Sequence, residues 1–350
     1  MSKMDIKSMH DEELSAILKE WGMPAFRTKQ IRNWLDNGVT SFDQMNNLPA
    51  TLRQQLSEHF RIPSVKILRR LVSQIDDTTK YLFELEDGQT VESVLMKYKH
   101  GWSQCLSTQV GCRMGCSFCA TGIDGLARDL LPSEMIAQIE AAEADRGIRV
   151  SSVVLMGMGE PLDNYENVLR FLEMLETEGG VHIGMRHVSL STCGLVDRIY
   201  DLMEKDLQIT LSISLHAPND ELRRRLMPVA RKWSVDELLA ACKAYTDRTG
   251  RRISYEYAMI DGVNDTDACA LELVKRLRGT LCHINLIPAN AVEGKTQRRS
   301  SKARLQRFTE ILTNGGLNAT VRRTLGSDIN ASCGQLRRSQ EQGIEQQFAD

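Results

Sequence analysis

The spacing of apolar residues separates a helical first part of the chain from a longer part with mixed patterns. In DEELSAILKEWG (11–22), FRTKQIRNWLDNG (26–38) and ATLRQQLSEHF (50–60), apolar residues recur at helical intervals, and an Asn-Gly pair ends the second segment. Acidic residues in the first turn of the first segment favour a helix start there. Residues 1–62 are therefore predicted to form a small helical accessory domain.

The pattern changes to β structure after residue 62. VKILRRLVSQ (65–74) and KYLFELEDGQTVESVLMKY (80–98) are typical of strands, and the Asp-Gly pair in the second is typical of a hairpin turn. We interpret residues 63–97 as a β bridge that leads into the main domain.

The remaining chain alternates predicted strands with predicted helices. This repetition predicts a parallel α/β sheet, either doubly wound or closed into a full or partial barrel. We assign this core to residues 98–333 and a C-terminal tail to residues 334–350. The apolar, β-branched runs are 104–110, 151–158, 186–192, 208–215, 252–260, 283–288 and 318–323. The amphipathic segments are 132–146, 164–178, 195–204, 234–248, 265–278 and 300–314.

Three cysteines follow the first strand of this core. Cys112, Cys116 and Cys119 lie in GCRMGCSFCATG with the spacing Cys-x3-Cys-x2-Cys. Other predicted strands end in polar or glycine-rich turns, namely GMGEP, STCG, SLHAPND and IPAN. Because ligands in parallel α/β folds bind at the carboxyl ends of the strands, we expect the cysteines and these turns to share one rim.

Three thiolates are too few for a closed metal site. Structural zinc takes four ligands, and so does a ferredoxin cluster. The nearest further candidates, His100 and Cys105, precede the loop at no standard spacing. Three cysteines on a four-iron cluster leave one iron open, and this spacing after the first strand is typical of radical S-adenosylmethionine (SAM) enzymes. Gly159 and Glu160 in GMGEP offer a backbone and a carboxylate to the SAM amino group, although that stretch alone would indicate only a tight turn.

Composition limits the remaining possibilities. The chain has 350 residues, of which 42% are hydrophobic, enough for one large α/β unit with an accessory domain. No apolar run reaches the ~18 residues of a membrane span, and the N-terminus has no apolar signal core. We therefore expect a cytoplasmic protein without a membrane anchor, whose nine cysteines are reduced thiols, metal ligands or catalysts.

The net charge of −2 confines any nucleic-acid surface to local clusters of basic residues. Each such cluster alone is ordinarily a solvated face, but several clusters around one site would form a track for phosphates. The candidates are Arg27, Lys29 and Arg32 in the accessory domain, and Arg223, Arg224, Arg225, Lys295, Arg298, Arg299, Lys302, Arg304, Arg322, Arg323, Arg337 and Arg338 in the C-terminal half.

Several motifs together resemble one enzyme family. CLSTQVGCRMGCSFC, LMGMGEPLDNYENV, SLHAPNDELRRRLMP, HINLIP and DINASCGQL resemble the RlmN/Cfr family of radical SAM RNA methyltransferases. FRTKQIRNW and LPATLRQQL extend the resemblance into the accessory domain, for which it implies RNA binding. The resemblance implies a partial (βα)6 TIM-like barrel, a [4Fe-4S] cluster and two SAM molecules per turnover.

The resemblance also implies a role for individual residues. Cys333 matches the cysteine that becomes S-methylated, Cys105 the cysteine that forms a transient disulfide with it, and Glu92 the proposed proton acceptor. Cys112, Cys116 and Cys119 match the cluster ligands. The positions that match SAM contacts are Gly159, Glu160, Ser191, Ser214, Leu215, His216 and Asn290.

The family chemistry gives these cysteines a physical reason. A ring carbon between two adenine nitrogens is too electron-poor to attack a methyl sulfonium, so a radical route is needed. One SAM methylates Cys333, and a second yields the radical that activates this methyl group for addition to the ring. A Cys105 thiolate then attacks the sulfur of Cys333 and releases the base, while Glu92 removes the ring proton. An adenine must leave its stack for this reaction, which favours exposed or partly unfolded RNA.

Alternatives remain at two levels. Within the family, RlmN enzymes methylate carbon 2 of an adenosine in the peptidyl-transferase region of 23S rRNA, and some also an adenosine in the tRNA anticodon loop, whereas Cfr enzymes methylate carbon 8 of that rRNA adenosine. MGMGEPL, SLHAPN and NLIP favour RlmN, while FCATGIDGL and KYKHGW also fit Cfr. We expect a monomer with a flavodoxin-type electron donor. Outside the family we consider an iron–sulfur electron carrier, a radical SAM activase and a non-catalytic RNA-binding protein.

Several candidates also have purely structural interpretations. Cys193, Cys242, Cys269 and Cys282 are expected to fill the core, as free cysteines commonly do. Without the resemblance, Cys105 and Cys333 would be interpreted in the same way. Glu92 lies in an alternating strand, where an exposed carboxylate is ordinarily only solvated.

Overall fold

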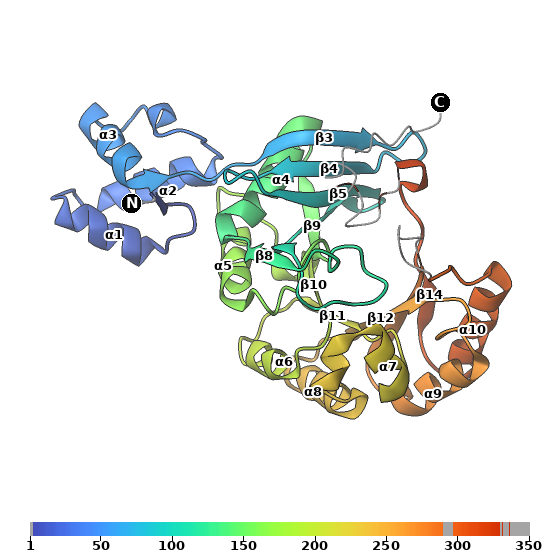
Figure 1. Ribbon diagram of the computed structural model, residues 1–350. Helices are drawn as coiled ribbons and strands as arrows, with labels where there is room; N and C mark the ends of the chain where they lie inside the picture. The colour runs from blue at the N-terminus through green and yellow to red at the C-terminus, as the bar shows by residue number, and fades with distance from the viewer. Residues whose placement is uncertain (1–2, 290–296, 330, 332–335, 337–350) are drawn as a thin grey trace.

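The computed structural model describes residues 3–289, 297–329, 331 and 336. Within them a ten-stranded sheet has the order β14-β13-β12-β11-β10-β9-β6-β5-β4-β3 (Figure 1). Neighbouring strands from β6 to β14 run parallel, and those from β3 to β6 run antiparallel. The strands are β3 (Lys66–Val72), β4 (Thr79–Glu84), β5 (Thr90–Tyr98), β6 (Gly101–Cys105), β9 (Val150–Leu155), β10 (Val188–Thr192), β11 (Thr210–Ser214), β12 (Ile253–Met259), β13 (Cys282–Pro288) and β14 (Ala319–Val321).

The parallel part confirms the predicted α/β partial barrel. Strands β3 and β14 form the two free ends of the sheet, so the barrel is open. The seven parallel strands correspond to the seven predicted runs, the last of which, 318–323, contains the short β14; the resemblance implies six. The β bridge is continuous with this sheet, because β5 pairs directly with β6.

Helices cover the outer face of the parallel strands and bury one continuous apolar core against them. Every predicted helix of the core is present, with ends shifted by at most a few residues. The helices are α4 (Pro132–Arg146), α5 (Tyr165–Leu175), α6 (Val196–Met203), α7 (Asp220–Leu226), α8 (Val235–Thr249), α9 (Asp267–Leu277) and α10 (Lys302–Asn314). None of the described helices is long and apolar enough to cross a membrane.

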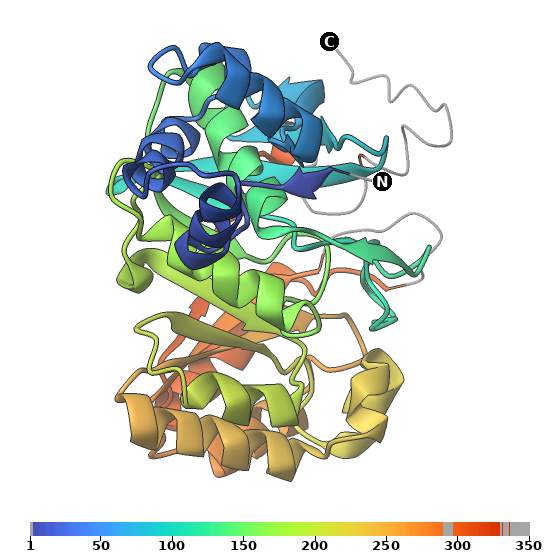
Figure 2. The same cartoon turned by 90° about the vertical axis from the view of Figure 1, so that its left-hand side faces the viewer.

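The accessory part has a separate apolar core. It contains the helices α1 (Asp11–Glu20), α2 (Phe26–Asp36) and α3 (Ala50–His59), together with the two-residue strands β1 (Met4–Asp5) and β2 (Phe60–Arg61). Figure 2 shows these blue helices against the green helices of the first repeats.

Charged and polar contacts join this accessory part to α4 and α5. Lys7 Nζ donates to both carboxylate oxygens of Glu140 at 2.5 and 2.7 Å. The Arg170 guanidinium donates to the carbonyls of Ser8 and Met9 at 3.0 and 2.6 Å. These contacts fix the accessory helices to one side of the barrel.

The first predicted core strand, 104–110, is divided in the structure. Strand β6 ends at Cys105, and Gln109–Gly111 forms β7, which pairs with β8 (Leu126–Asp129) in a separate small sheet. The backbone N–H groups of Thr108 and Gln109 donate to the Met158 carbonyl, so the chain bends across the end of β9. The cysteine loop therefore connects two short antiparallel strands, β7 and β8, and does not directly follow a strand of the barrel.

Glycine is required where this loop closes. Gly111 has φ = +81°, and a Cβ there would lie 2.0 Å from the Gly125 carbonyl oxygen. Gly125 has a similar φ of +72°, but open space around it. A residue with a Cβ would therefore strain the backbone at either position, but it would clash with neighbouring atoms only at Gly111.

We predict that Gly111→Ala destabilises the protein far more than Gly125→Ala. Backbone strain costs about 1–2 kcal/mol at either position, and overpacking adds about 1–3 kcal/mol at Gly111 alone. The free energy of unfolding from urea titration measures both. Equal losses for the two variants would contradict the close approach at Gly111.

Candidate active site

A cavity of about 320 Å³ lies at the carboxyl ends of the parallel strands. Its wall combines the cysteine loop with the ends of β9 to β13, where ligands bind in parallel barrels. The residues that line it include Cys112, Met114, Cys116, Phe118, Cys119, Met156, Gly159, Glu160, Ser191, Thr192, Cys193, Ser214, His216, Glu256, Ile287 and Arg322.

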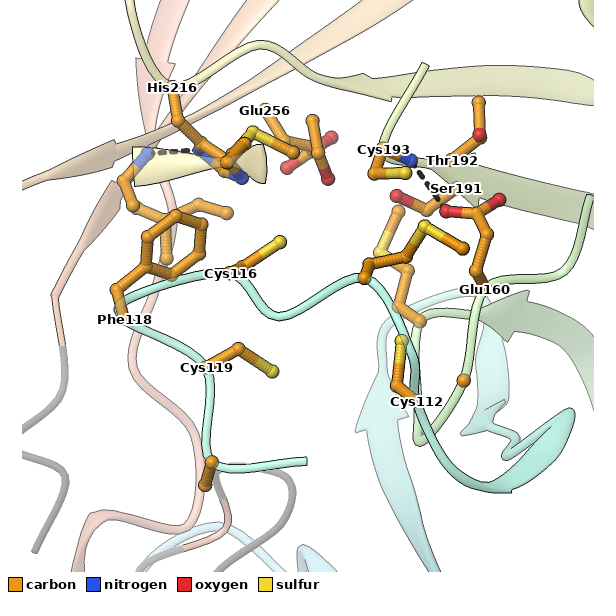
Figure 3. A pocket seen from close by; sticks show the side chains of 18 of the residues that line it. Cys112, Cys116, Phe118, Cys119, Glu160, Ser191, Thr192, Cys193, His216 and Glu256 are labelled. Carbon is orange, nitrogen blue, oxygen red and sulfur yellow. Dashed lines mark hydrogen bonds between the residues drawn. The ribbon is translucent and has the colours of Figure 1, made fainter. Parts of the chain in front are cut away.

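The three loop cysteines lie around one space (Figure 3). Cys112 is buried, and Cys116 and Cys119 are partly buried. Burial raises the pKa of the Cys112 thiol to about 12 and that of the Cys116 thiol still further. Without a bound cation these thiols stay protonated at neutral pH, so metal binding must release protons.

The arrangement fits a cluster better than a single ion. No three described His, Cys, Asp or Glu side chains converge on one metal position. Cysteines that ligate a four-iron cluster bind different irons, so their sulfurs need not converge. Cys112, Cys116 and Cys119 therefore have the thiol chemistry and the placement to hold three irons of such a cluster.

Glu160 is buried and held by the end of β10. Its carboxylate accepts hydrogen bonds from the Cys193 N–H at 2.6 Å and the Leu162 N–H at 3.0 Å. Burial raises the pKa of Glu160, and these hydrogen bonds partly oppose that shift. The carboxylate is thus a fixed acceptor in the cavity wall, suited to an ammonium group.

Gly159 positions Glu160 at this wall. It has φ = +108°, and a Cβ would lie 2.7 Å from the Gln109 backbone nitrogen. The neighbouring Glu160 N–H donates to Gln109 Oε1 at 2.8 Å. Only glycine permits this close crossing of the two segments.

His216 follows β11 and is neutral. Its Nδ1 accepts the Ala258 N–H at 2.9 Å, so the ring proton resides on Nε2. Burial, with a smaller effect of the Arg223 charge, lowers its pKa to about 3. Phe118 of the cysteine loop packs edge-on against the ring at 4.7 Å between centroids.

The other predicted SAM contacts divide into three groups. Ser191 and Ser214 line the cavity. The Leu215 side chain lies in the apolar core, and its backbone N–H donates to the Glu256 carbonyl at 3.1 Å. Asn290 lies outside the described residues, as does Cys333.

Cys105 lies at the end of β6 in a second cavity of about 190 Å³. Met156, Ile287 and Arg322 line both cavities, so the two adjoin. Tyr98, at the end of β5, and Arg323 also line the second cavity, and because both are exposed we call them its outer part. Cys105 is therefore close to the cysteine-loop cavity without belonging to it.

Glu92 is buried rather than solvated. Its side chain is fully enclosed on β5 and lies 3.1 Å from Lys80 Nζ on β4. Cross-strand pairing places the two on the same sheet face as Val94, which is opposite Cys105. The structure thus excludes the solvated alternative and brings Glu92 to the interior of the barrel near Cys105.

Two residues that line the cavity, Glu256 and Cys193, were not predicted to do so from the sequence. Glu256, on β12, is buried, and Asn285 Nδ2 donates to it at 2.7 Å. Burial raises its pKa, while Arg322 opposes the shift. Cys193, assigned to the core, lines the cavity, and its thiol hydrogen-bonds to Glu160. An acidic residue inside the otherwise apolar strand at 252–260 was the available signal for Glu256.

Burial excludes one of the predicted RNA-binding arginines, Arg223, and a second, Arg32, is engaged in contacts within the protein. Arg223 is fully buried, and Arg32 donates to Asp11 and to the Lys7 and Met9 carbonyls. Arg304 is paired with Asp267 at 2.7 Å. Lys295, Arg337 and Arg338 lie outside the described residues. The exposed members of the set are Lys29, Arg224, Arg225, Arg298, Arg299, Lys302 and Arg323.

Family models place this geometry in a known class. Residues 106–274 match the model of the radical SAM superfamily, whose enzymes use a [4Fe-4S] cluster and SAM. Residues 4–62 match the ribosomal RNA large subunit methyltransferase N-terminal domain. The open barrel with its three-cysteine loop is therefore a radical SAM enzyme.

Similar proteins narrow the class. The chain is 52% identical over 328 residues to a protein of Clostridium botulinum named "Probable dual-specificity RNA methyltransferase RlmN", covering 94% of each chain. It is 51% identical to a protein of the same name from Alkaliphilus oremlandii, covering 97% of this chain and 98% of that one.

A solved structure agrees with these relatives. The crystal structure of a radical SAM methyltransferase from Sphaerobacter thermophilus matches with a TM-score of 0.89 and 43% identity, covering 95% of this chain and 98% of that one. The chain belongs to the RlmN family of SAM-dependent radical SAM RNA methyltransferases.

We predict that His216→Asn makes stability less sensitive to acid. The folded pKa of about 3 lies below the unfolded value, so the unfolded state binds the proton first and stability falls as pH falls below about 6.5. Asparagine keeps an acceptor near the Nδ1 position and tolerates the φ of +54°. Between pH 7 and 5 the wild type should lose about 2 kcal/mol more than the variant. The unfolding free energies of the wild type and the variant are measured across this pH range. Equal losses of stability in the two proteins would refute the prediction.

Proposed function

We propose that this enzyme methylates carbon 2 of an adenosine in 23S rRNA and of an adenosine in the tRNA anticodon loop. The supporting observation is the full-length similarity, at about half identity, to relatives named as dual-specificity RlmN enzymes. A cavity with three thiols that adjoins a second cavity with another thiol supports the two-cysteine chemistry.

Each cavity has its own part in this proposal. Cys112, Cys116 and Cys119 hold the cluster, and SAM lies against Glu160, Ser191, Ser214 and His216, with Leu215 and Asn290 completing its contacts. When bound, the cluster and SAM supply a radical that abstracts hydrogen, and two SAM molecules are used per turnover. The neutral His216 and the Glu160 carboxylate, each held by a backbone N–H donor, bind and orient SAM.

The cysteine pair transfers the methyl group. A Cys333 thiolate takes a methyl group from SAM, and S-adenosylhomocysteine leaves. After this methyl group has lost one hydrogen atom to the radical, its carbon bonds to the adenine ring. Once the adduct has returned one electron to the oxidised cluster, a Cys105 thiolate forms a disulfide with Cys333. The sulfur–carbon bond breaks, and its electron pair stays on the carbon, which takes up a proton to become the methyl group of the product. Glu92 accepts the ring proton, with Lys80 balancing its charge inside the sheet.

The outer part of the second cavity suits an extruded nucleotide. The Tyr98 ring stacks nearly parallel to His100, at 5.3 Å between centroids and 11° between planes. Arg323, which also lines this cavity, is exposed. An aromatic face and a guanidinium are the groups that bind an unstacked base and its phosphate.

Other partners follow from the same proposal. A flavodoxin-type protein supplies the electron, and the accessory helices contribute to RNA binding. The protein acts as a monomer in this proposal, and the RNA substrates support a cytoplasmic location.

The decisive experiment maps the methylated atom. The protein is reconstituted anaerobically with iron and sulfide, and receives SAM, reductant and protein-free 23S rRNA or tRNA. We expect 2-methyladenosine in nucleoside mass spectra from both RNAs. 8-Methyladenosine would instead assign the Cfr-type reaction. 5′-Deoxyadenosine without methylated RNA would contradict the proposed substrates while leaving the radical chemistry in place.

Replacing Cys105 should trap the enzyme on its substrate. In Cys105→Ala no thiolate can release the base, so we expect a covalent RNA–protein adduct and only background levels of free methylated RNA. Denaturing gel electrophoresis detects the adduct. Cys282→Ala is the matched control, since Cys282 is a buried core cysteine on β13. Normal product yield from Cys105→Ala would contradict the resolving role.

A further inference from the structure

Arg223 differs from its two arginine neighbours on α7. Arg224 and Arg225 are exposed, whereas Arg223 has no accessible surface and is the largest fully enclosed side chain among the described residues. Buried arginines are rare because the guanidinium is always charged and loses its hydration. Its position therefore needs a compensating interaction.

No described carboxylate forms an ion pair with this guanidinium, and the compensating carboxylate of Asp220 acts on it only through space. Arg223 forms no ion pair within 4 Å among the described residues, in contrast to the buried Lys80, which pairs with Glu92. Its Nη2 donates to the Cys193 carbonyl at 2.5 Å and the Ser214 carbonyl at 3.3 Å, and Nε donates to the Leu215 carbonyl at 3.3 Å.

These contacts leave part of the guanidinium unsatisfied. Nη1 is buried and has no hydrogen-bond partner. Neutral carbonyls balance only part of a full positive charge in a poorly solvated site. The part of the guanidinium charge that the carbonyls do not balance therefore attracts negative groups nearby.

The thiols of the proposed cluster site lie near this charge. Helix α7 ends against the cysteine loop, where the Ser117 N–H donates to the Leu226 carbonyl at 2.8 Å. Cys116 packs in the same small apolar cluster as Cys193 and Leu226. Arg223 Nη2 donates to the Cys193 carbonyl, and Cys193 lines the same cavity as Cys112, Cys116 and Cys119.

We propose that Arg223 is a positioning residue that supplies a permanent buried positive charge to the cysteine-ligated cluster and raises its reduction potential. The inference rests on the proposed ligation by Cys112, Cys116 and Cys119, and it is independent of the RNA substrate. Reduction adds one electron and no proton, so the site becomes more negative. A nearby cation stabilises the reduced form more than the oxidised form, and it does so strongly where water is excluded.

Arginine suits this role better than lysine. Its guanidinium cannot lose its proton in the protein, so the charge persists whether or not the cluster is present. Its planar fork reaches carbonyls after both β10 and β11, which fixes the charge relative to the loop. A lysine would retain a charge but fewer of these contacts.

The test is a redox titration of the reconstituted cluster, followed by electron paramagnetic resonance without SAM or RNA. Arg223→Met removes the charge, Arg223→Gln removes it but keeps hydrogen-bonding groups, and Arg223→Lys retains it. Arg225→Met is the control on the exposed side of α7. Iron analysis is performed on every sample, and the signal reports only protein that carries a cluster.

We expect the midpoint potentials of Arg223→Met and Arg223→Gln to shift to more negative values. Arg223→Lys should lie closer to the wild type, and Arg225→Met should match it. If one neutral variant does not fold, the other decides. An unshifted potential in a neutral variant with a loaded cluster would overturn the inference, even if that variant were less stable. Absence of iron in the wild type would instead contradict the cysteine ligation.

Discussion

The parallel backbone ladder from β6 to β14 is the constraint on which the site depends. Because all these strands point the same way, their carboxyl ends meet at one rim, and the register between them decides which side chains face inward. Ser191 pairs with Ser212, Ser214 with Glu256, and Glu256 with Asn285. If any of these pairings shifted by one residue, a polar side chain that faces the cavity would instead point into the apolar core.

The rim is lined by charges that would be costly without nearby partners. The Glu160 carboxylate accepts a hydrogen bond from the Cys193 N–H, just after β10. Glu256 accepts one from Asn285 and lies near the Arg322 charge, and Glu92 pairs with Lys80. Because these groups are excluded from water and held by the backbone, their fields act strongly and need little reorganisation when a charged ligand binds. The interior of the barrel is thus organised electrostatically before any cofactor is present.

The two adjoining cavities contain different reactive groups. The larger holds the three loop thiols and the groups suited to SAM, and the smaller holds Cys105. Met156, Ile287 and Arg322 form their common boundary. The accessory helices lie outside this arrangement, fixed to α4 and α5 by Lys7 and Arg170. The two cavities therefore adjoin but have different linings.

Local patterns in the sequence determined the helices, most of the strands and the cysteine motif, because each depends on residues close together in the chain. The helix at 132–146 and the Asp87-Gly88 hairpin are examples that the structure confirms. Family motifs added the candidate SAM contacts, which periodicity cannot identify, and Glu160, Ser191, Ser214 and His216 among them line the cavity.

Only the tertiary structure decided which charges are inside. Three successive arginines, Arg223, Arg224 and Arg225, lie in one short helix. Arg223 is buried because it packs against the ends of β10 and β11, whereas Arg224 and Arg225 are exposed. Likewise, Glu92 is buried because β4 supplies Lys80, and Cys193 reaches the cavity because β10 ends beside Glu160. Burial and electrostatic partnership arise between segments distant in the chain, so no local pattern encodes them.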